Sequence, residues 1–385
     1  MCTKTLYMKG DDRMIKSLYI KNFKNIQELT INSLGNVNLI VGKNNVGKST
    51  LLEAISVYLA NGNEEYLRQL LESRGEAIKL YSTEENKEEV IGSRYLSLFY
   101  ERQENLSKQF AIVIGETEDD KGATRISQVY ILEESYNDED NLNRTRRTSC
   151  SNEDLETVTN ASTIMTGLGL KIISGKFSNI IPFSRAGRGF SNVENRAKFQ
   201  YVHTVDFQTE KNAVFFDKIA LSPEEEYIIE ALQIINPKIN RINFLYEDGE
   251  RRGHSARIPV VTLEEDENKY RLSSMGDGIN RILTIILAML NCKGGVMLLD
   301  EFETGLHYSV QDELWRIIFM LSEKLNIQVF VTSHSNDCIN SFARTNTNGQ
   351  GVLIRLENRK GYIVAVEYED NNELMFATNN NVEIR

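Results

Sequence analysis

Apolar and polar residues alternate from residue 15 to residue 23, and this period of two predicts a first strand. A second apolar run at residues 37–41 leads directly into a glycine-containing segment. Beyond that segment apolar residues recur at helical spacing, namely Leu51, Leu52, Ala54, Ile55 and Tyr58. The pattern therefore predicts a strand, a loop and a helix in that order.

The middle of the chain has weaker patterns. Short strands are expected at residues 109–114 and 127–132, forming a small sheet appended to the core. Residues 135–162 are so polar that an exposed loop or mobile linker is expected there, marking a boundary. A helix is predicted at residues 222–235, because Ser222 and Pro223 suit its start and Pro237 follows its end.

Strands and helices alternate in the last third of the chain. Strands are predicted at residues 258–263, 296–301 and 327–332, and a hairpin at 352–366. A helix follows the turn SSMGDG, and an amphipathic helix is predicted at 310–324. This alternation favours an α/β fold with a mixed, mainly parallel sheet flanked by helices, whose ligand edge is the carboxyl end of the strands.

Length and composition restrict the possibilities further. A chain of 385 residues fits one large domain with an insertion, or two domains. No uncharged apolar stretch is long enough to span a membrane, and the four cysteines are far apart, so we expect a cytoplasmic protein. The net charge of −11 argues against a surface that coats nucleic acid, although local basic patches are compatible with it.

One motif carries most of the chemical information. The segment GKNNVGKS fits G-x-x-x-x-G-K-[ST] and lies between the predicted buried strand and helix. Backbone N–H groups of such a loop curl round phosphates, its lysine reaches the β- and γ-phosphates, and its serine hydroxyl ligates Mg²⁺. The alternative is a glycine turn that only caps a helix. The expected ATP-binding residues are Gly42, Lys43, Asn44, Asn45, Val46, Gly47, Lys48, Ser49 and Thr50.

Two carboxylates end the strand VMLLDE. Burial of bare carboxylates is unfavourable, and Mg²⁺ bound by Ser49 and Asp300 would compensate one of them. Glu301 would then polarise the attacking water and act as the catalytic base. The alternative is an acidic helix cap after the strand.

The next strand ends in TSHS, which places His334 at the same edge. His334 could bind the γ-phosphate or orient water, although a lone histidine is more often structural. The turn around Ser274 and Gly276 is a second anion-binding turn, far from the first in sequence. If it cannot reach the nucleotide of its own chain it must serve a partner's, which predicts a head-to-tail dimer with two shared sites. The alternative is a glycine-rich cap of a core helix.

In this order, GKNNVGKS, SSMGDG, LLDEFETGLH and TSHS resemble the ABC-class ATPase heads of RecF, SMC and OLD-type proteins. MIKSLYIKNFKNI and DEFETGLHYSVQ resemble stand-alone ATP-binding proteins of the AAA/OLD-like group, which are often linked to anti-phage defence.

The resemblance implies a P-loop fold with an inserted α+β or helical region. It also implies Lys48 and Glu301 as catalytic residues, with His334 as the switch histidine. Ser274, Gly276 and Asp277 fall where the family signature contacts the opposite subunit's ATP, although Met275 and Asp277 depart from LSGGQ. A glutamine with a switching role should follow the helix after the phosphate loop, and Gln103 is a candidate. Residues 303–307 would communicate across the dimer.

The domain division expected from these motifs has four parts. They are an N-terminal extension (1–13), the N-terminal part of the ATPase head (14–134), an inserted or lid region (135–245) and the C-terminal part of the head (246–385). Only about 50 residues follow His334 and they contain no DxD, so we expect no nuclease domain.

Basic segments leave the partner question open. Arg144, Arg146 and Arg147 lie in one segment, and Arg185 and Arg188, flanked by Phe183 and Phe190, lie in another. They could hold DNA or an acidic partner, or be solvated loops.

Three hypotheses follow. The first is an ATP- and Mg²⁺-dependent homodimer, or higher homo-oligomer, that controls a separate effector, such as a Toprim-type nuclease or toxin, in anti-phage defence. The second is a DNA-clamping ATPase of RecF or SMC type, and the third is a scaffold that binds ATP with little turnover.

Overall fold

The computed structural model describes residues 14–75, 94–137, 143–158, 163–183, 194–204, 209–246, 257–371, 373 and 375. The N-terminal extension (1–13) and the segment containing Arg185, Arg188 and Phe190 lie outside the described residues.

A six-stranded sheet forms the centre of the molecule. Five of its strands are parallel and only the edge strand β16 is antiparallel to its neighbour. In spatial order the strands are β16 (Tyr362–Tyr368), β15 (Gly351–Arg359), β3 (Val37–Gly42), β14 (Gln328–Thr332), β13 (Val296–Leu299) and β9 (Phe199–Val202). The predicted mainly parallel sheet is therefore confirmed.

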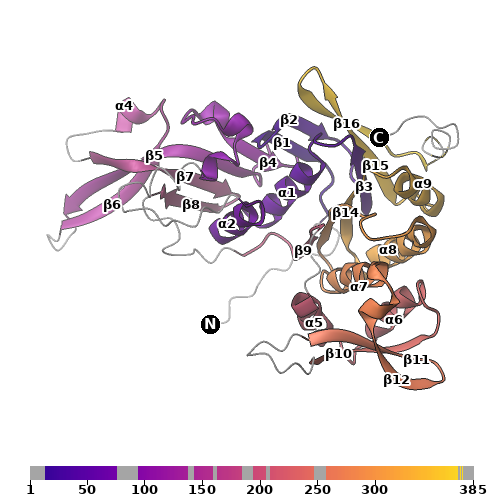
Figure 1. Ribbon diagram of the computed structural model, residues 1–385. Coiled ribbons are helices and arrows are strands. Elements are labelled where there is room, and N and C mark those ends of the chain that lie inside the picture. The colour runs from indigo at the N-terminus through magenta and orange to yellow at the C-terminus, as the bar shows by residue number, and fades with distance from the viewer. Residues whose placement is uncertain are drawn as a thin grey trace.

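Both faces of this sheet are covered, which explains why its central strands are apolar runs. Val37, Leu39 and Val41 belong to the core on one face, and Ile40 belongs to the core on the other. In Figure 1, α1 lies on one side of β3 and β14, and α7, α8 and α9 lie on the other. The bounds of these helices, and of α2, are α1 (Lys48–Leu59), α2 (Glu64–Ser73), α7 (Asp277–Leu290), α8 (Gln311–Leu325) and α9 (Asn336–Thr345).

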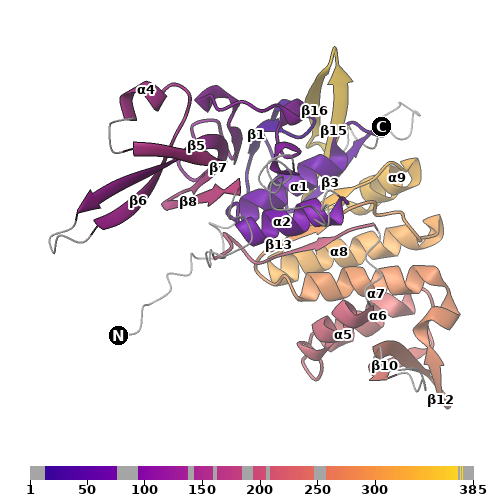
Figure 2. The ribbon, with the colours of Figure 1, turned by 60° about the vertical axis from the view of Figure 1, so that its left-hand side comes forward.

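A seven-stranded antiparallel sheet packs over α1 and extends away from the parallel sheet, as both ribbon views show (Figures 1 and 2). Its main path is β2 (Ile26–Ile31), β1 (Leu18–Phe23), β4 (Ile112–Gly115), β5 (Thr124–Asn137), β7 (Thr163–Ser174) and β8 (Phe177–Pro182). Strand β6 (Asn143–Cys150) also pairs with β5, and the short helix α4 (Leu155–Val158) follows it.

The prediction of a loop at residues 135–162 is wrong for the residues that form strands. Strand β5 continues to Asn137, and β6 begins at Asn143. Hydrophilic residues form these strands because their charges pair across them. Arg146 stands opposite Glu134, and the Arg147 guanidinium lies 2.8 Å from the Glu133 carboxylate. The remaining residues of the predicted loop include α4 and segments outside the described residues.

A third, antiparallel sheet lies at the other end of the molecule, beside α5 and α6 (Figure 1). Its elements and helices are β10 (Ile239–Tyr246), β11 (Arg257–Leu263), β12 (Asp266–Arg271), α5 (Thr209–Asp217) and α6 (Glu225–Gln233). The predicted cap of the 222–235 helix is wrong, because Ser222 Oγ donates to the Ile219 carbonyl and the helix begins at Glu225. Short 3-10 turns occur at Tyr100–Arg102, Lys108–Phe110, Leu272–Met275 and Tyr308–Val310.

Candidate nucleotide site

The phosphate-binding motif forms a loop between β3 and α1 whose backbone requires glycine. Gly47 has φ of 101° and directly precedes α1, and Asn45 is also left-handed at 62°. A Cβ on Gly42 would lie 2.6 Å from the Leu356 carbonyl oxygen of β15. The loop therefore wraps tightly, and the first N–H groups of α1, which have no helical partners, face an anion-binding position.

Lys48 extends back along this loop. Its Nζ donates to the Gly42 carbonyl at 2.7 Å and to the Lys43 carbonyl at 3.0 Å. Burial lowers the pKa of Lys48, and the nearby charges of Glu303, Asp300 and Glu301 oppose that shift. The ammonium thus stands in the loop with carboxylates opposite it.

Three oxygens meet where the loop faces β13. Ser49 Oγ donates to Asp300 Oδ1 at 3.0 Å, and Thr332 Oγ1 donates to the same oxygen at 2.6 Å. Asp300 is buried. Two neighbouring ligands of an octahedral Mg²⁺ stand about 2.9 Å apart. Ser49 and Asp300 therefore fit this ion by chemistry and by spacing.

Glu301 follows on the same edge with a left-handed backbone, φ 51°. Its N–H donates to Thr332 Oγ1 at 2.8 Å, and its Oε2 accepts from Thr304 Oγ1 at 3.1 Å. These contacts direct the carboxylate into the cleft, which Glu301 lines.

His334 also lines the cleft and is half exposed. Its Nδ1 and its backbone N–H each lie 2.8 Å from Glu303 Oε1. Glu303 therefore holds the imidazole in place. His307, at the end of the predicted communication loop, instead contacts Ser309 Oγ at 2.8 Å and starts the 3-10 turn after it.

These residues surround one cleft of about 690 Å³. It brings together the predicted residues Asn44, Asn45, Gly47, Lys48, Ser49, Thr50, Asp300, Glu301 and His334 with Lys24, Asn25, Glu53 and Arg74.

The last four lining residues were not predicted from the sequence. Glu53, 1% exposed on α1, accepts from Lys24 Nζ at 2.7 Å and from Arg74 Nε at 2.5 Å. One buried carboxylate thus holds two cations from the β1–β2 turn and the end of α2 at the cleft. No local motif marks these positions, because only the tertiary fold brings them together.

The turn predicted to bind a second anion lies elsewhere. Ser274 and Gly276 are exposed and are not among the described residues that line the cleft. Ser274 Oγ donates to the Arg271 carbonyl at 2.7 Å, and Gly276, with φ of 108°, precedes α7. Asp277 begins α7, and its side chain lies outside the description.

The candidate Gln103 is not supported. Its side chain donates to Glu101 at 3.1 Å, its carbonyl accepts from Gln128, and it does not line the cleft. Gln103 directly follows the 3-10 turn Tyr100–Arg102, and its carbonyl contacts Gln128 of the antiparallel sheet rather than a residue of the ligand edge. The order along the chain misled the prediction here.

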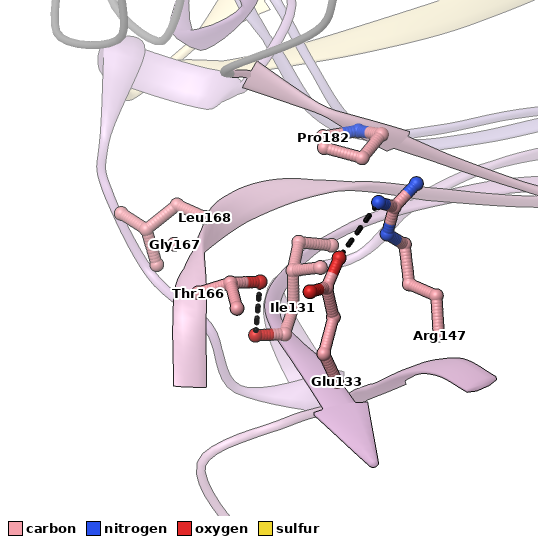
Figure 3. A pocket seen from close by; sticks show the side chains of 7 residues that line it. All are labelled: Ile131, Glu133, Arg147, Thr166, Gly167, Leu168 and Pro182. Atoms are coloured by element: carbon pink, nitrogen blue, oxygen red, sulfur yellow. Dashed lines mark hydrogen bonds and ion pairs between the residues drawn. The ribbon is translucent and has the colours of Figure 1, made fainter. Parts of the chain in front are cut away.

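A second, smaller hollow of about 170 Å³ lies on the antiparallel sheet (Figure 3). Arg147 and Glu133 face each other within it, and Thr166 Oγ1 donates to the Ile131 carbonyl at 3.4 Å. Among the residues of the predicted basic segments, Phe183 is buried and stacks on Tyr95 at 5.8 Å. Arg147 is thus paired with a carboxylate, which reduces its attraction for phosphate.

Cysteine usage is simple in the part of the chain that the structure describes. Cys150, Cys292 and Cys338 are buried free thiols, and burial raises the pKa of each. Cys2 lies outside the described residues. No described helix has both the length and the apolar character to cross a bilayer.

A glycine loop between a buried parallel strand and a helix, with carboxylates at the end of another parallel strand of the same sheet, separated from the first by one strand, defines a P-loop ATPase. The family described as AAA ATPase domain matches residues 14–339, and the chain belongs to this family of ATP-binding ATPases.

Individual proteins are also similar to this chain. The chain is similar to an "ATP/GTP phosphatase" of Helicobacter pylori, with 25% identity over 354 residues that cover 85% of this chain and 86% of the relative. Two solved structures are also similar. An SMC head bound to the C-terminal winged-helix domain of ScpA has 14% identity and a TM-score of 0.48, covering 92% of this chain and 97% of the other. An SMC head domain of Thermotoga maritima has 11% identity and a TM-score of 0.43, covering 92% and 99%.

Proposed function

We propose that the chain is an ABC-type ATPase that closes as a homodimer on two ATP molecules, so that closure controls a separate effector. One observation carries this proposal. The turn at Ser274 and Gly276 exposes a helix start to solvent, and the cleft of its own chain is built without it. A head-to-tail partner would bring this turn to the nucleotide and complete each site.

The proposal assigns binding roles to the phosphate-loop residues and to the charged residues of the cleft. The backbone of residues 42–47 and Lys48 hold the phosphates, and Ser49 and Asp300 hold Mg²⁺. When bound, Mg²⁺ neutralises phosphate charge. Lys24 and Arg74, both paired with Glu53, add positive charge to the lining of the cleft. Because carboxylates and cations face each other, the cleft fits a bound polyanion with its cation.

Glu301 is the proposed general base, because its carboxylate lines the cleft and its backbone N–H is fixed by a hydrogen bond to the Thr332 hydroxyl. His334, positioned by Glu303, is the proposed contact to the γ-phosphate. Hydrolysis is slow and regulatory in this proposal, since each site waits for the partner's turn.

The proposed domain division assigns residues 14–134 and 246–385 to the head and 135–245 to an inserted region. The structure supports a projecting region near this position, although the 134/135 boundary lies within β5 and β9 of the central sheet falls between 135 and 245. We propose that the seven-stranded antiparallel sheet, which extends away from the parallel sheet, receives the effector. The proposed effector is a Toprim-type nuclease or toxin in anti-phage defence. Buried free thiols support a cytoplasmic location.

Mixed dimers test the composite site. A Lys48→Ala chain combined with a Ser274→Arg chain should retain one competent composite site, and so release phosphate faster than either parent. Each parent alone should be inactive. A mixture as inactive as its parents, although each parent still dimerises in sedimentation, would contradict the shared-site proposal.

The alternative function is a DNA clamp of RecF or SMC type. The local basic segment favours it, but Arg147 is paired with Glu133. Phosphate release that rises with added duplex DNA, and falls again with salt, would support the clamp. Release stimulated only by a second protein would support the effector switch.

A further inference from the structure

Arg281 belongs to the second turn of α7 and is completely buried, 0% exposed. Its Nη2 donates to the carbonyl oxygens of Asp300 at 2.8 Å and Glu301 at 3.2 Å, and its Nη1 donates to that of His203 at 3.1 Å. A planar guanidinium suits several acceptors at fixed angles. One side chain of α7 therefore holds the backbone that carries both cleft carboxylates.

The backbone that it holds is strained. Glu301 has φ of 51°, a conformation that non-glycine residues keep only where their surroundings fix it. The N–H of Glu301 is fixed by the Thr332 hydroxyl, and its carbonyl is fixed by Arg281. The direction of the Glu301 carboxylate thus depends on β14 through one contact and on α7 through the other.

A second contact joins α7 to the same loop. A Cβ on Gly278, in the first turn of α7, would lie 2.9 Å from the Gly305 carbonyl oxygen. Helix and loop therefore touch through backbone alone at this point. The start of α7 and residues 301–305 cannot shift independently without opening one of these two contacts.

We propose that Arg281 is a positioning residue that couples the turn at Ser274 and Gly276 to Glu301. The inference rests on the proposed function, in which this turn binds the partner's nucleotide. Binding there fixes the start of α7, and Arg281 passes that constraint to the Glu301 backbone. Nucleotide occupancy at one composite site then sets the hydrolysis rate at the other, and by linkage the coupling of the two binding equilibria is reciprocal.

Two substitutions test this coupling by different routes. Arg281→Lys keeps the charge and loses the fork, whereas Gly278→Ala keeps the guanidinium and forces the helix off the loop. Because neither residue lines the cleft, the affinity of a single chain for Mg·ATP in calorimetry should change far less than kcat. In both variants kcat should fall about tenfold or more, since small misplacements of a catalytic group are costly. The dependence of rate on ATP should lose its cooperativity.

Hydrogen exchange gives a readout that does not depend on activity. Amides of residues 300–304 should exchange faster in both variants, while those of the phosphate loop keep wild-type protection. The control is Ile286→Ala, which removes buried apolar volume from the same helix and, being an aliphatic side chain, forms no hydrogen bond with these groups. It should lower Tm and leave kcat and cooperativity at wild-type values.

Three results would overturn the coupling. The first is wild-type kcat and cooperativity in Gly278→Ala, which decides the matter even if Arg281→Lys does not fold. The second is a fall in kcat for Ile286→Ala that matches the fall for Arg281→Lys at equal loss of Tm. The third is wild-type protein without Mg²⁺-dependent ATP hydrolysis, which contradicts the proposed function itself and removes the coupling with it.

Discussion

At the scale of single residues, unusual backbone conformations gather at the cleft. Asn45, Gly47 and Glu301 all have positive φ, and all three line it. A non-glycine residue in this region costs on the order of 1–3 kcal/mol and persists where other contacts fix it. The fold therefore spends stability at this edge to aim groups that a relaxed backbone would direct elsewhere.

Glu301→Gln tests the general base. The amide keeps the shape of the side chain but cannot take a proton, so phosphate release should fall about 10²- to 10⁴-fold. ATP should remain bound, and the dimer should accumulate in sedimentation with ATP. Phosphate release at the wild-type rate would remove Glu301 from this role.

Glu53→Gln tests the buried carboxylate that holds Lys24 and Arg74. Two cations would then share a neutral amide, and the free energy of unfolding should fall by roughly 2–3 kcal/mol in a urea titration. The lower end of the range reflects Arg74, which is 43% exposed. Glu65→Gln is the control, since the Glu65–Arg68 pair lies on the surface of α2 and should contribute under about 1 kcal/mol. Equal losses for the two variants would contradict the assigned importance of Glu53.

The sequence was sufficient for residues whose chemistry is local. Gly42, Lys48 and Ser49 lie in one motif, and Asp300 and Glu301 end one apolar run, and all five lie where the patterns predict. Lys24, Glu53 and Arg74 could not be predicted in this way, because their shared function depends on contacts between three separate elements. Arg281 gave no signal either, since a lone arginine in a helical pattern is most often a surface residue.

At the scale of elements, prediction succeeded where burial was one-sided or complete. The apolar runs of β3, β13 and β14 were found because both faces of the central sheet are covered. The strand β9 was missed because it is a short edge strand, FQYV, that is only partly buried and so shows no apolar run. The polar strand β6 was missed because its charged residues face charged residues of β5, one pair of which is the Arg147–Glu133 ion pair, so no apolar alternation marks it.

Phe302→Ala tests how the loop after Glu301 is anchored to α8. Phe302 and Trp315 are both completely buried and stack with their ring centroids 4.4 Å apart. Removing the ring should lower the free energy of unfolding by about 3–5 kcal/mol. Trp315 is the only tryptophan of the chain, so its fluorescence reports unfolding in urea. The control Phe110→Ala, at a 39% exposed position, should change it by less than about 0.5 kcal/mol, and a similar loss in both would contradict the anchor.

At the scale of the whole molecule, the turn at Ser274 does not line the cleft of its own chain. The turn at Ser274 precedes α7, and Arg281 of α7 holds the Glu301 carbonyl. In the proposed dimer this turn binds the nucleotide of the second copy. The seven-stranded antiparallel sheet extends away from the central sheet (Figure 1), and its proposed role is to receive the effector. The dimer and the effector remain proposals that the mixed-chain and stimulation experiments decide.

The central claim is that the loop from Gly42 to Ser49, completed by Asp300, binds ATP together with Mg²⁺. Calorimetric titration of the purified protein with ATP, with Mg²⁺ and with EDTA in its place, tests it most directly. The account predicts binding that requires Mg²⁺, that is lost in Lys48→Ala, and that is retained in Lys293→Ala, whose lysine pairs with Glu224 on the surface. Absence of Mg²⁺-dependent ATP binding by the wild-type protein would contradict it.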